Sequence, residues 1–186
     1  MKVFTWGVEK VDDAQVVCVD EKEMIQEFVI WLNAIDPDVI TGWYSNGFDV
    51  PYLIRRAFRL GAYIDGLSRQ DNGTIAVKEV FRTFNIRITG RQSIDMMEVF
   101  QNWHKPRGQR DSWGLKDVAK DFLGIEYEDL GGLIQEVIDE GRIEELMEYC
   151  KKDVEVLIGL DKKLGLFEFY EYLRMKTGVK LSLIHI

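Results

Sequence analysis

The chain has 186 residues, 46% of them hydrophobic, which is enough for a globular domain with a buried core. Its formal net charge of −8 excludes DNA binding through bulk positive charge, although it allows an enzyme whose carboxylates hold cations. Two cysteines, Cys18 and Cys150, are too few for a disulfide framework or a zinc site, and we expect both in the core. No apolar run is long enough for a membrane span, and no signal peptide is visible. The expected location is cytoplasmic, or nuclear in a eukaryote.

Hydrophobic periodicity and turn residues predict the elements of the first half of the chain. In chain order these are strands over 3–8 and 15–19, a helix over 20–35, a strand over 39–43, a helix over 51–60, and a hairpin formed by 74–80 and 82–89. Pro37 ends the first helix, because the residue before a proline is pushed out of the α region. Gly61 is a C-cap signal for the second.

The second half is predicted to be mainly helical. The expected elements are a strand or strand-to-helix segment over 94–100, a basic loop over 101–112, a helix capped by Ser112 and ended by Gly124, a long helix from about 143 past 160, and a further helix after 165. The apolar stripe of the long helix is expected to consist of Leu146, Cys150, Val154 and Leu157. Because strands and helices alternate over the chain as a whole, the pattern favours an α/β fold.

One corner of the predicted fold carries a carboxylate. The strand over 39–43 reaches a short polar loop, then Asp49, then a helix that Pro51 can open. In α/β sheets, ligands bind outside the carboxyl ends of strands, so Asp49 is a candidate site residue. The alternative is that Asp49 only caps the helix, since Asp is a preferred N-cap residue.

The helix after this corner has a basic edge formed by Arg55, Arg56 and Arg59. We interpret this edge as a solvated face, with a DNA contact as the less favoured alternative.

A second candidate lies on the long helix, where Tyr149 and Asp153 are four residues apart. Residues at this spacing share one face of a helix. That face borders the apolar stripe, so a carboxylate there needs a cation, a donor or a metal as partner. The alternative is an ordinary pair in which Lys151 or Lys152 answers Asp153.

Taken together, these stretches resemble the 3′–5′ proofreading exonuclease domain of family B DNA polymerases over roughly residues 1–175. The segments that carry the resemblance are residues 41–53 with Phe48-Asp49 at their core, the lead-in over 36–43, the helix sequence over 115–124, and the Tyr-x-x-x-Asp motif at 149–153. In this order and spacing the resemblance is specific, although each motif alone is weak.

The resemblance implies a ribonuclease-H-like fold, with a mixed sheet flanked by helices, and a site with two divalent metal ions, Mg²⁺ or Mn²⁺. It implies that Asp153 and Asp49 are metal ligands and that Tyr149 orients the attacking water. One ion would activate that water and the other would stabilise the leaving 3′ oxygen. Oxygen ligands suit such hard ions. Phe48 and the preceding loop, including Tyr44 and Asn46, would contact the unpaired 3′ end of single-stranded DNA.

The chain departs from the family pattern at two places. Tyr44 stands where the family has an asparagine, and it is open whether Asn46 takes over that role. The family's first motif, an Asp-x-Glu on the first strand upstream of Thr41, is missing, and Asp20 and Glu21 do not have its spacing. We therefore expect an N-terminally truncated domain, poorly stable because the sheet lacks a strand, and inactive by itself.

The expected organisation is a partial exonuclease domain over 1–180 followed by a non-native tail over 181–186. One choice of codons for that tail resembles an adapter used in sequencing libraries, whereas the alternative is a short native strand.

The predicted function is that of a fragment of a DNA-directed DNA polymerase, with single-stranded DNA and the polymerase domain of the same parent chain as partners. The alternatives are a stand-alone repair exonuclease, a non-catalytic module that binds single strands, and a purely structural domain in which the two aspartates are far apart.

Overall fold

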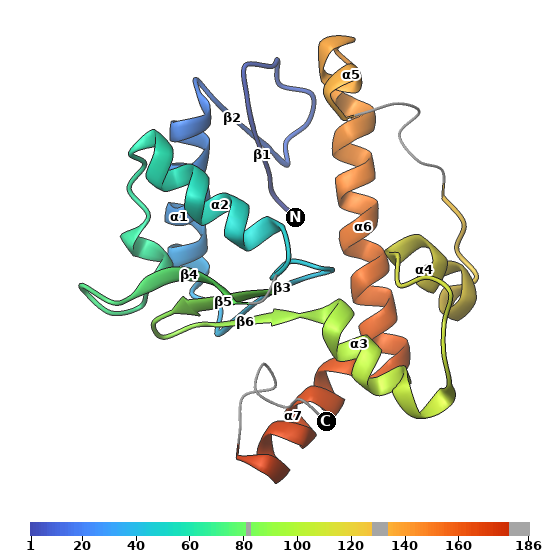
Figure 1. Cartoon of the computed structure of the whole chain (residues 1–186). Helices are drawn as coiled ribbons and strands as arrows, with labels where there is room; N and C mark the ends of the chain where they lie inside the picture. The colour runs from blue at the N-terminus through green and yellow to red at the C-terminus, as the bar shows by residue number, and fades with distance from the viewer. Residues whose placement is uncertain (81–82, 128–133, 179–186) are drawn as a thin grey trace. The chain divides into compact units, whose positions relative to one another are not determined.

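The computed structural model describes residues 1–80, 83–127 and 134–178 (Figure 1). The chain divides into two compact units, residues 1–94 and 95–186, and each is described by itself. The predicted tail over 181–186 lies outside the described residues.

The first unit combines short strands with two helices. Its elements are β1 (Val3–Trp6), β2 (Gln15–Cys18), α1 (Glu21–Ile35), β3 (Val39–Gly42), α2 (Asp49–Leu60), a 3-10 turn (Asp65–Leu67), β4 (Ile75–Val80), β5 (Thr83–Ile88) and β6 (Gln92–Asp95), whose last residue begins the second unit. These elements confirm the predicted strands, helices and hairpin of this half of the chain. The α/β class of the prediction is confirmed as well.

The strands of the described residues do not form the single mixed sheet that we predicted. They pair as three two-stranded sheets, β1 with β2, β3 with β6, and β4 with β5. β1 and β2 run parallel, with Val3 opposite Gln15, and the Gln15 amide holds the loop between them by donating to Thr5 Oγ1 at 2.8 Å. β4 and β5 form an antiparallel hairpin, with Ile75 opposite Ile88.

Local signals in the sequence explain where α1 and α2 begin and end. Asp20 accepts a hydrogen bond from the backbone N–H of Glu23 and so caps α1, whose C-cap residue Asp36 is left-handed. Gly61 ends α2 at φ 61°, a backbone conformation that glycine adopts without steric cost.

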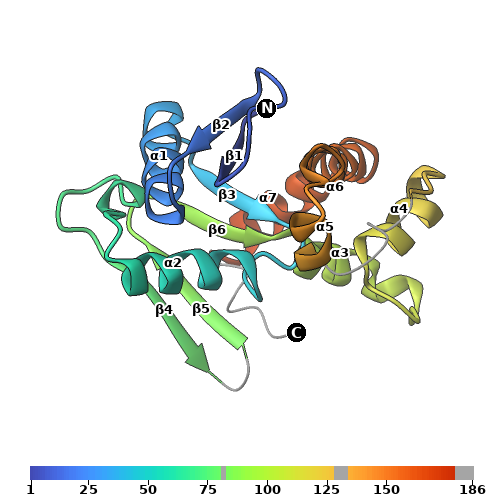
Figure 2. The same cartoon turned by 90° about the horizontal axis from the view of Figure 1, so that it is seen from above.

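The core of the first unit lies where α1, α2 and the hairpin meet. The buried apolar side chains that form it are Ile25, Val29, Leu32, Val50, Ile54, Ala57, Ile64, Leu67 and Ile88. Figure 2 shows α2 running alongside the β4–β5 hairpin. The buried side of α2 is therefore fixed against the core, and the opposite side is left for other contacts.

The second unit is helical. It contains α3 (Met96–His104), a 3-10 turn (Lys105–Arg107), α4 (Leu115–Leu123), α5 (Ile134–Asp139), α6 (Ile143–Leu164) and α7 (Leu166–Thr177). Phe100, which is fully buried, forms its aromatic centre together with Trp103, His104, Trp113 and Phe122. α4 packs closely on α6, since a Cβ atom placed on Gly159 would lie 3.2 Å from Leu123 Cδ1.

Three details of the second half were predicted wrongly. The segment over 101–112 is not a loop throughout, because α3 continues to His104 and a 3-10 turn follows. Ser112 does not cap α4. Gly114 is the N-cap residue, and the Ser112 hydroxyl instead donates to Asp117 Oδ2 and accepts from the Gly114 N–H.

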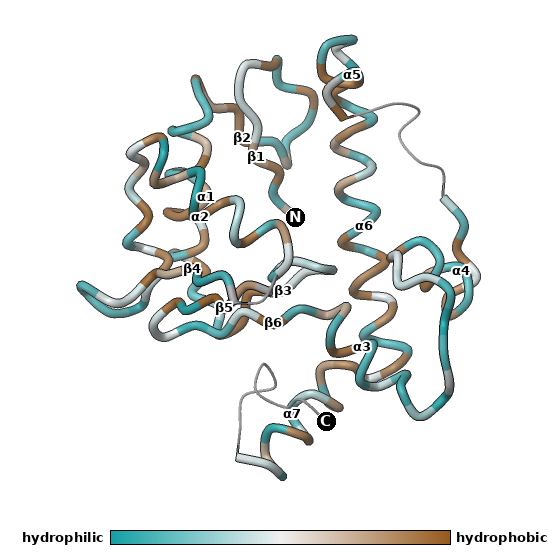
Figure 3. The backbone as a smooth tube through the Cα atoms, in the orientation of Figure 1, coloured by the Kyte–Doolittle hydropathy of each residue, from teal (hydrophilic) through white to brown (hydrophobic). Residues whose placement is uncertain are grey.

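The third wrong prediction concerns which residues of α6 are buried. Its buried residues are Met147, Val156 and Leu160, whereas Cys150 and Val154 are exposed. The prediction chose the wrong stripe because apolar residues occur on more than one face of this helix. Figure 3 shows apolar and polar residues alternating along α6. Cys18 is buried as expected, so only one of the two cysteines belongs to the core.

In the described parts of the chain, no helix is both long and apolar enough to cross a bilayer.

Candidate active site

The candidate residues fall in both compact units: Tyr44, Asn46, Phe48 and Asp49 in the first, Tyr149 and Asp153 in the second.

The first group lies at the strand–loop–helix corner that the sequence predicted, between β3 and α2. The loop closes on itself, because the Tyr44 carbonyl accepts hydrogen bonds from the N–H groups of Gly47 and Phe48, both at 3.0 Å. Tyr44 has a left-handed backbone with φ 59°, and its ring folds over Gly47. A Cβ atom on Gly47 would lie 2.3 Å from this ring, so any side chain at 47 would force the Tyr44 ring to move.

Two hydrogen bonds tie the corner to β6. The Ser93 hydroxyl donates to Asn46 Oδ1 at 2.5 Å, and the Thr41 hydroxyl donates to the Ile94 carbonyl at 2.7 Å. Asn46 is thus held by the neighbouring strand, which the sequence did not indicate.

Asp49 is the first residue of α2 and is exposed. The N-cap position belongs to Phe48, which makes no side-chain capping bond. A carboxylate in the first turn is favoured by the helix dipole, so the position suits a negative charge whether or not it binds a ligand. Phe48 is 63% exposed and stacks on Tyr52, with ring centroids 5.9 Å apart.

The second group lies on α6, where Tyr149 and Asp153 are both half-buried. Two residues that the sequence did not single out surround them. The Tyr127 hydroxyl donates a hydrogen bond of 2.6 Å to Asp153 Oδ1, and the Tyr127 and Tyr149 rings lie 6.2 Å apart. The Lys116 ammonium lies 4.9 Å from the centroid of the Tyr149 ring and 5.1 Å from that of Tyr127.

This arrangement shows which residue is the described partner of the Asp153 carboxylate. The sequence offered Lys151 or Lys152 as its partner, and the described contact is instead a phenol from a segment 26 residues upstream. Nothing in the local sequence around Tyr127 signals this contact, because it depends on how the segment after α4 returns to α6.

The carboxylates of the two groups have the oxygen donors that Mg²⁺ and Mn²⁺ prefer. However, over residues 1–80, 83–127 and 134–178, no group of three or more His, Cys, Asp or Glu side chains is arranged to hold a metal ion. The described residues therefore suit such ions in donor type but do not by themselves complete a metal site.

Comparison with known proteins places these residues in a family. A family model described as "DNA polymerase family B, exonuclease domain" matches residues 5–118, which include the corner with Asp49. The chain is also similar to proteins named DNA polymerase delta catalytic subunit. It is 30% identical to that of Caenorhabditis elegans over 90% of the chain, and 31% identical to those of Glycine max and Drosophila melanogaster over 88% and 91%. The chain spans only 16% of the length of these relatives. Because the family model covers more than half of the chain, this protein belongs to the exonuclease-domain family of family B DNA polymerases.

Proposed function

We propose that the chain is the 3′–5′ exonuclease module of a DNA-directed DNA polymerase and that it has a ribonuclease-H-like fold. The observation that carries the proposal is the family match over residues 5–118. The similarity to the polymerase delta subunit of Caenorhabditis elegans extends over 90% of the chain, so it necessarily includes the Tyr149 and Asp153 motif as well. The substrate is the unpaired 3′ end of single-stranded DNA, and the polymerase domain of the same parent protein is the partner.

Asp49 and Asp153 are the proposed metal ligands. When bound, two divalent ions would supply an activated water and stabilise the leaving oxygen. The described carboxylates do not complete a metal site. The roles of the neighbouring residues are therefore limited to holding side chains in position. Tyr127 holds the Asp153 carboxylate in place through its 2.6 Å hydrogen bond, and Tyr149 presents its phenol on the same helical face.

The DNA-binding roles belong to the corner before α2. The exposed ring of Phe48 offers a surface on which a terminal base can stack. Tyr44 and Asn46 would line the same loop. The described contact of Asn46 with Ser93 holds its side-chain oxygen in this loop.

The test is a proofreading assay on the longer polymerase that carries this domain. The substrate is a 5′-labelled primer with a mismatched 3′ nucleotide, in Mg²⁺. We expect Asp49→Asn and Asp153→Asn to slow removal of the mismatch more than about 100-fold while primer extension continues, because even changes to outer-shell partners of metal ligands cost about 10–100-fold. Asp71→Asn and Glu155→Gln, both at exposed positions, are the matched controls.

Two outcomes would overturn the proposal. If both aspartate variants trim the primer at the rate of the controls, these carboxylates are not part of the site. If the unsubstituted longer polymerase binds single strands but cleaves none with Mg²⁺ or Mn²⁺, the alternative of a non-catalytic binding module is correct.

A further inference from the structure

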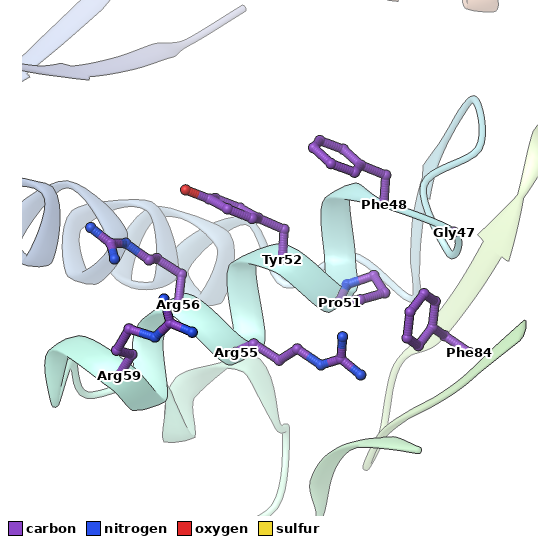
Figure 4. Close-up of a pocket in the computed structure, with 8 residues that line it drawn as sticks. All are labelled: Gly47, Phe48, Pro51, Tyr52, Arg55, Arg56, Arg59 and Phe84. Carbon is purple, nitrogen blue, oxygen red and sulfur yellow. The ribbon is translucent and has the colours of Figure 1, made fainter. Parts of the chain in front are cut away.

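The outer side of α2 carries a pocket that shares Phe48 with the proposed exonuclease site and extends beyond it. It has a volume of about 250 Å³ and continues from Phe48 along the helix to Arg59, with Phe84 of β5 on its far wall (Figure 4). Apart from Gly47 and Pro51, the described residues that line it are aromatic or cationic, and none of them carries a carboxylate. In a chain with 32 acidic and 24 basic residues, a lining with three arginines and no acid is a local reversal of the overall charge.

The aromatic wall is open to a ligand. Phe48 and Tyr52 stack with their ring planes 15° apart and lie on the same side of α2, yet they are 63% and 55% exposed. Each ring therefore covers part of the other and leaves the rest in water. Stacked, exposed aromatic rings of this kind accept the face of a nucleic-acid base without regard to sequence.

The three arginines of the pocket differ in how firmly they are held. Arg56 is paired with Glu21 of α1, because its Nε donates to the two carboxylate oxygens of Glu21 at 2.8 and 2.9 Å. This hydrogen bonding raises the pKa of the Arg56 guanidinium above the ordinary value. Its charge is neutralised within the protein, so its role is to join α1 to α2.

Arg55 is held only loosely. Its guanidinium lies 4.7 Å from the centroid of the Phe84 ring and reaches Glu79 at 3.5 Å, with both ends of that ion pair more than half exposed. Exposed pairs of this length contribute little to stability, so a phosphate can replace Glu79 at low cost. Figure 4 shows Arg55 extending from α2 toward Phe84, which leaves the cation at the floor of the pocket.

Arg59, one helical turn further on, has no ion pair or hydrogen bond within residues 1–80, 83–127 and 134–178. The distance along α2 from Asp49 to Arg59 is about 15 Å at 1.5 Å per residue. Along α2 the pocket therefore offers, one after another, the stacked rings of Phe48 and Tyr52, the weakly paired cation of Arg55, and the cation of Arg59.

We propose that this α2 pocket, formed by Tyr52, Arg55, Arg59 and Phe84, is a subsite for single-stranded DNA next to the terminal nucleotide. Tyr52 stacks on a base, and Arg55 and Arg59 contact the phosphates that follow it. The proposal rests on the proposed function, since it extends the path of the same strand whose end lies at Phe48. The proposal differs from our interpretation of the sequence, in which Arg55, Arg56 and Arg59 formed a solvated face.

The test measures binding separately from cleavage. The 186-residue chain is titrated into fluorescein-labelled oligothymidylate in EDTA, and fluorescence anisotropy is recorded at several salt concentrations. We expect Tyr52→Leu to weaken binding about tenfold, since one stacked base contributes roughly 1–3 kcal/mol. Arg55→Ala and Arg59→Ala should each weaken binding and lower the slope of log Kd against log salt by about 0.7, the value for one phosphate contact on a single strand.

The matched control is Arg87→Ala, an exposed arginine of β5 outside the pocket that changes the net charge equally. It should leave the affinity within twofold. Arg59→Gln, checked by circular dichroism, repeats the test with a side chain that keeps its stem.

The subsite proposal is overturned if the unsubstituted chain does not bind the oligonucleotide, or if Tyr52→Leu and Arg59→Gln bind as tightly as the control. It is also overturned if polyglutamate competes as well as oligothymidylate, or if the annealed duplex binds equally well. The exonuclease proposal fails on a different measurement, because it is tested by cleavage in Mg²⁺ with Asp153→Asn, whereas the subsite is tested by binding in EDTA.

Discussion

Tyr127 donates a 2.6 Å hydrogen bond to the carboxylate of Asp153, which we propose as a metal ligand. The two residues are 26 positions apart and come from different segments of the second unit. A carboxylate that accepts a hydrogen bond on one oxygen keeps the other available, so the bond fixes the side chain without closing it to a ligand.

The first prediction concerns this bond. Tyr127→Phe removes the donor and keeps the ring, so we expect the free energy of unfolding to fall by about 1 kcal/mol. In the proposed parent polymerase, removal of a mismatched 3′ nucleotide should slow about 10–100-fold if Asp153 binds metal as proposed, because outer-shell partners orient a ligand. Denaturant unfolding and the proofreading assay measure the two effects, with Tyr172→Phe, an exposed tyrosine, as control. A Tyr127→Phe variant that matches this control in both assays would show that the bond has no role.

The second prediction concerns the cation between the two tyrosines. Lys116→Met removes the charge that lies near the Tyr127 and Tyr149 rings and should lower the free energy of unfolding by about 0.5–1 kcal/mol. Lys116→Arg keeps a cation there and should retain most of the stability. Denaturant unfolding is the measurement, and Lys22→Met on the exposed side of α1 is the control. Equal losses for the Met and Arg variants would argue for packing rather than charge.

The sequence predicted the corner before α2 well because its signals are local. Pro51 at the start of the helix and Gly61 at its end each act within one turn, and the structure has α2 over Asp49–Leu60. The arrangement of the strands was less predictable. Pairing depends on contacts between distant segments, and the described strands form three small sheets where one mixed sheet was expected.

The candidate site shows the same limit. The spacing of Tyr149 and Asp153 placed both on one face of α6, which follows from helical geometry alone. Their partners Tyr127 and Lys116 could not be predicted, because no spacing rule connects them to α6 and the contacts arise only from tertiary packing. The prediction of which side of α6 is buried was wrong for the same reason, because the segments that pack against the helix decide which side is buried.

The third prediction concerns the aromatic centre of the second unit. Phe100 is fully buried, and its ring centroid lies 5.3 Å from that of Phe122 and 5.9 Å from that of Trp103. Phe100→Ala should lower the free energy of unfolding by about 3–5 kcal/mol, through lost burial and the cavity that remains. Phe58→Ala, at a position 64% exposed, should change it by less than about 0.5 kcal/mol in a parallel denaturation experiment. Similar losses for the two variants would contradict the described core.

The fourth prediction concerns the pH dependence of the first unit. The Arg91 side chain is fully buried, donates to the carbonyls of Leu67 and Pro37, and pairs with Asp36 at 2.9 Å. Asp36 also pairs with Arg69 at 2.5 Å, and hydrogen bonding from Arg69, helped by the charge of Arg91, holds the pKa of the Asp36 carboxyl below its ordinary value of 3.8. A depressed carboxyl pKa gives stability that is fully present above the ordinary value and is lost as the pH falls below it, through the depressed pKa of the folded state.

The melting temperature should therefore decline as the pH falls below about 4, and Asp36→Asn should make that decline shallower. Asparagine is the matched replacement because Asp36 has a left-handed backbone with φ 52°, which asparagine tolerates. Asp71→Asn, at an exposed position, should follow the unsubstituted chain at every pH. Thermal melts between pH 3 and pH 7 measure the effect, and an Asp36→Asn curve parallel to that of the unsubstituted chain would show that the Asp36 charge does not stabilise the fold.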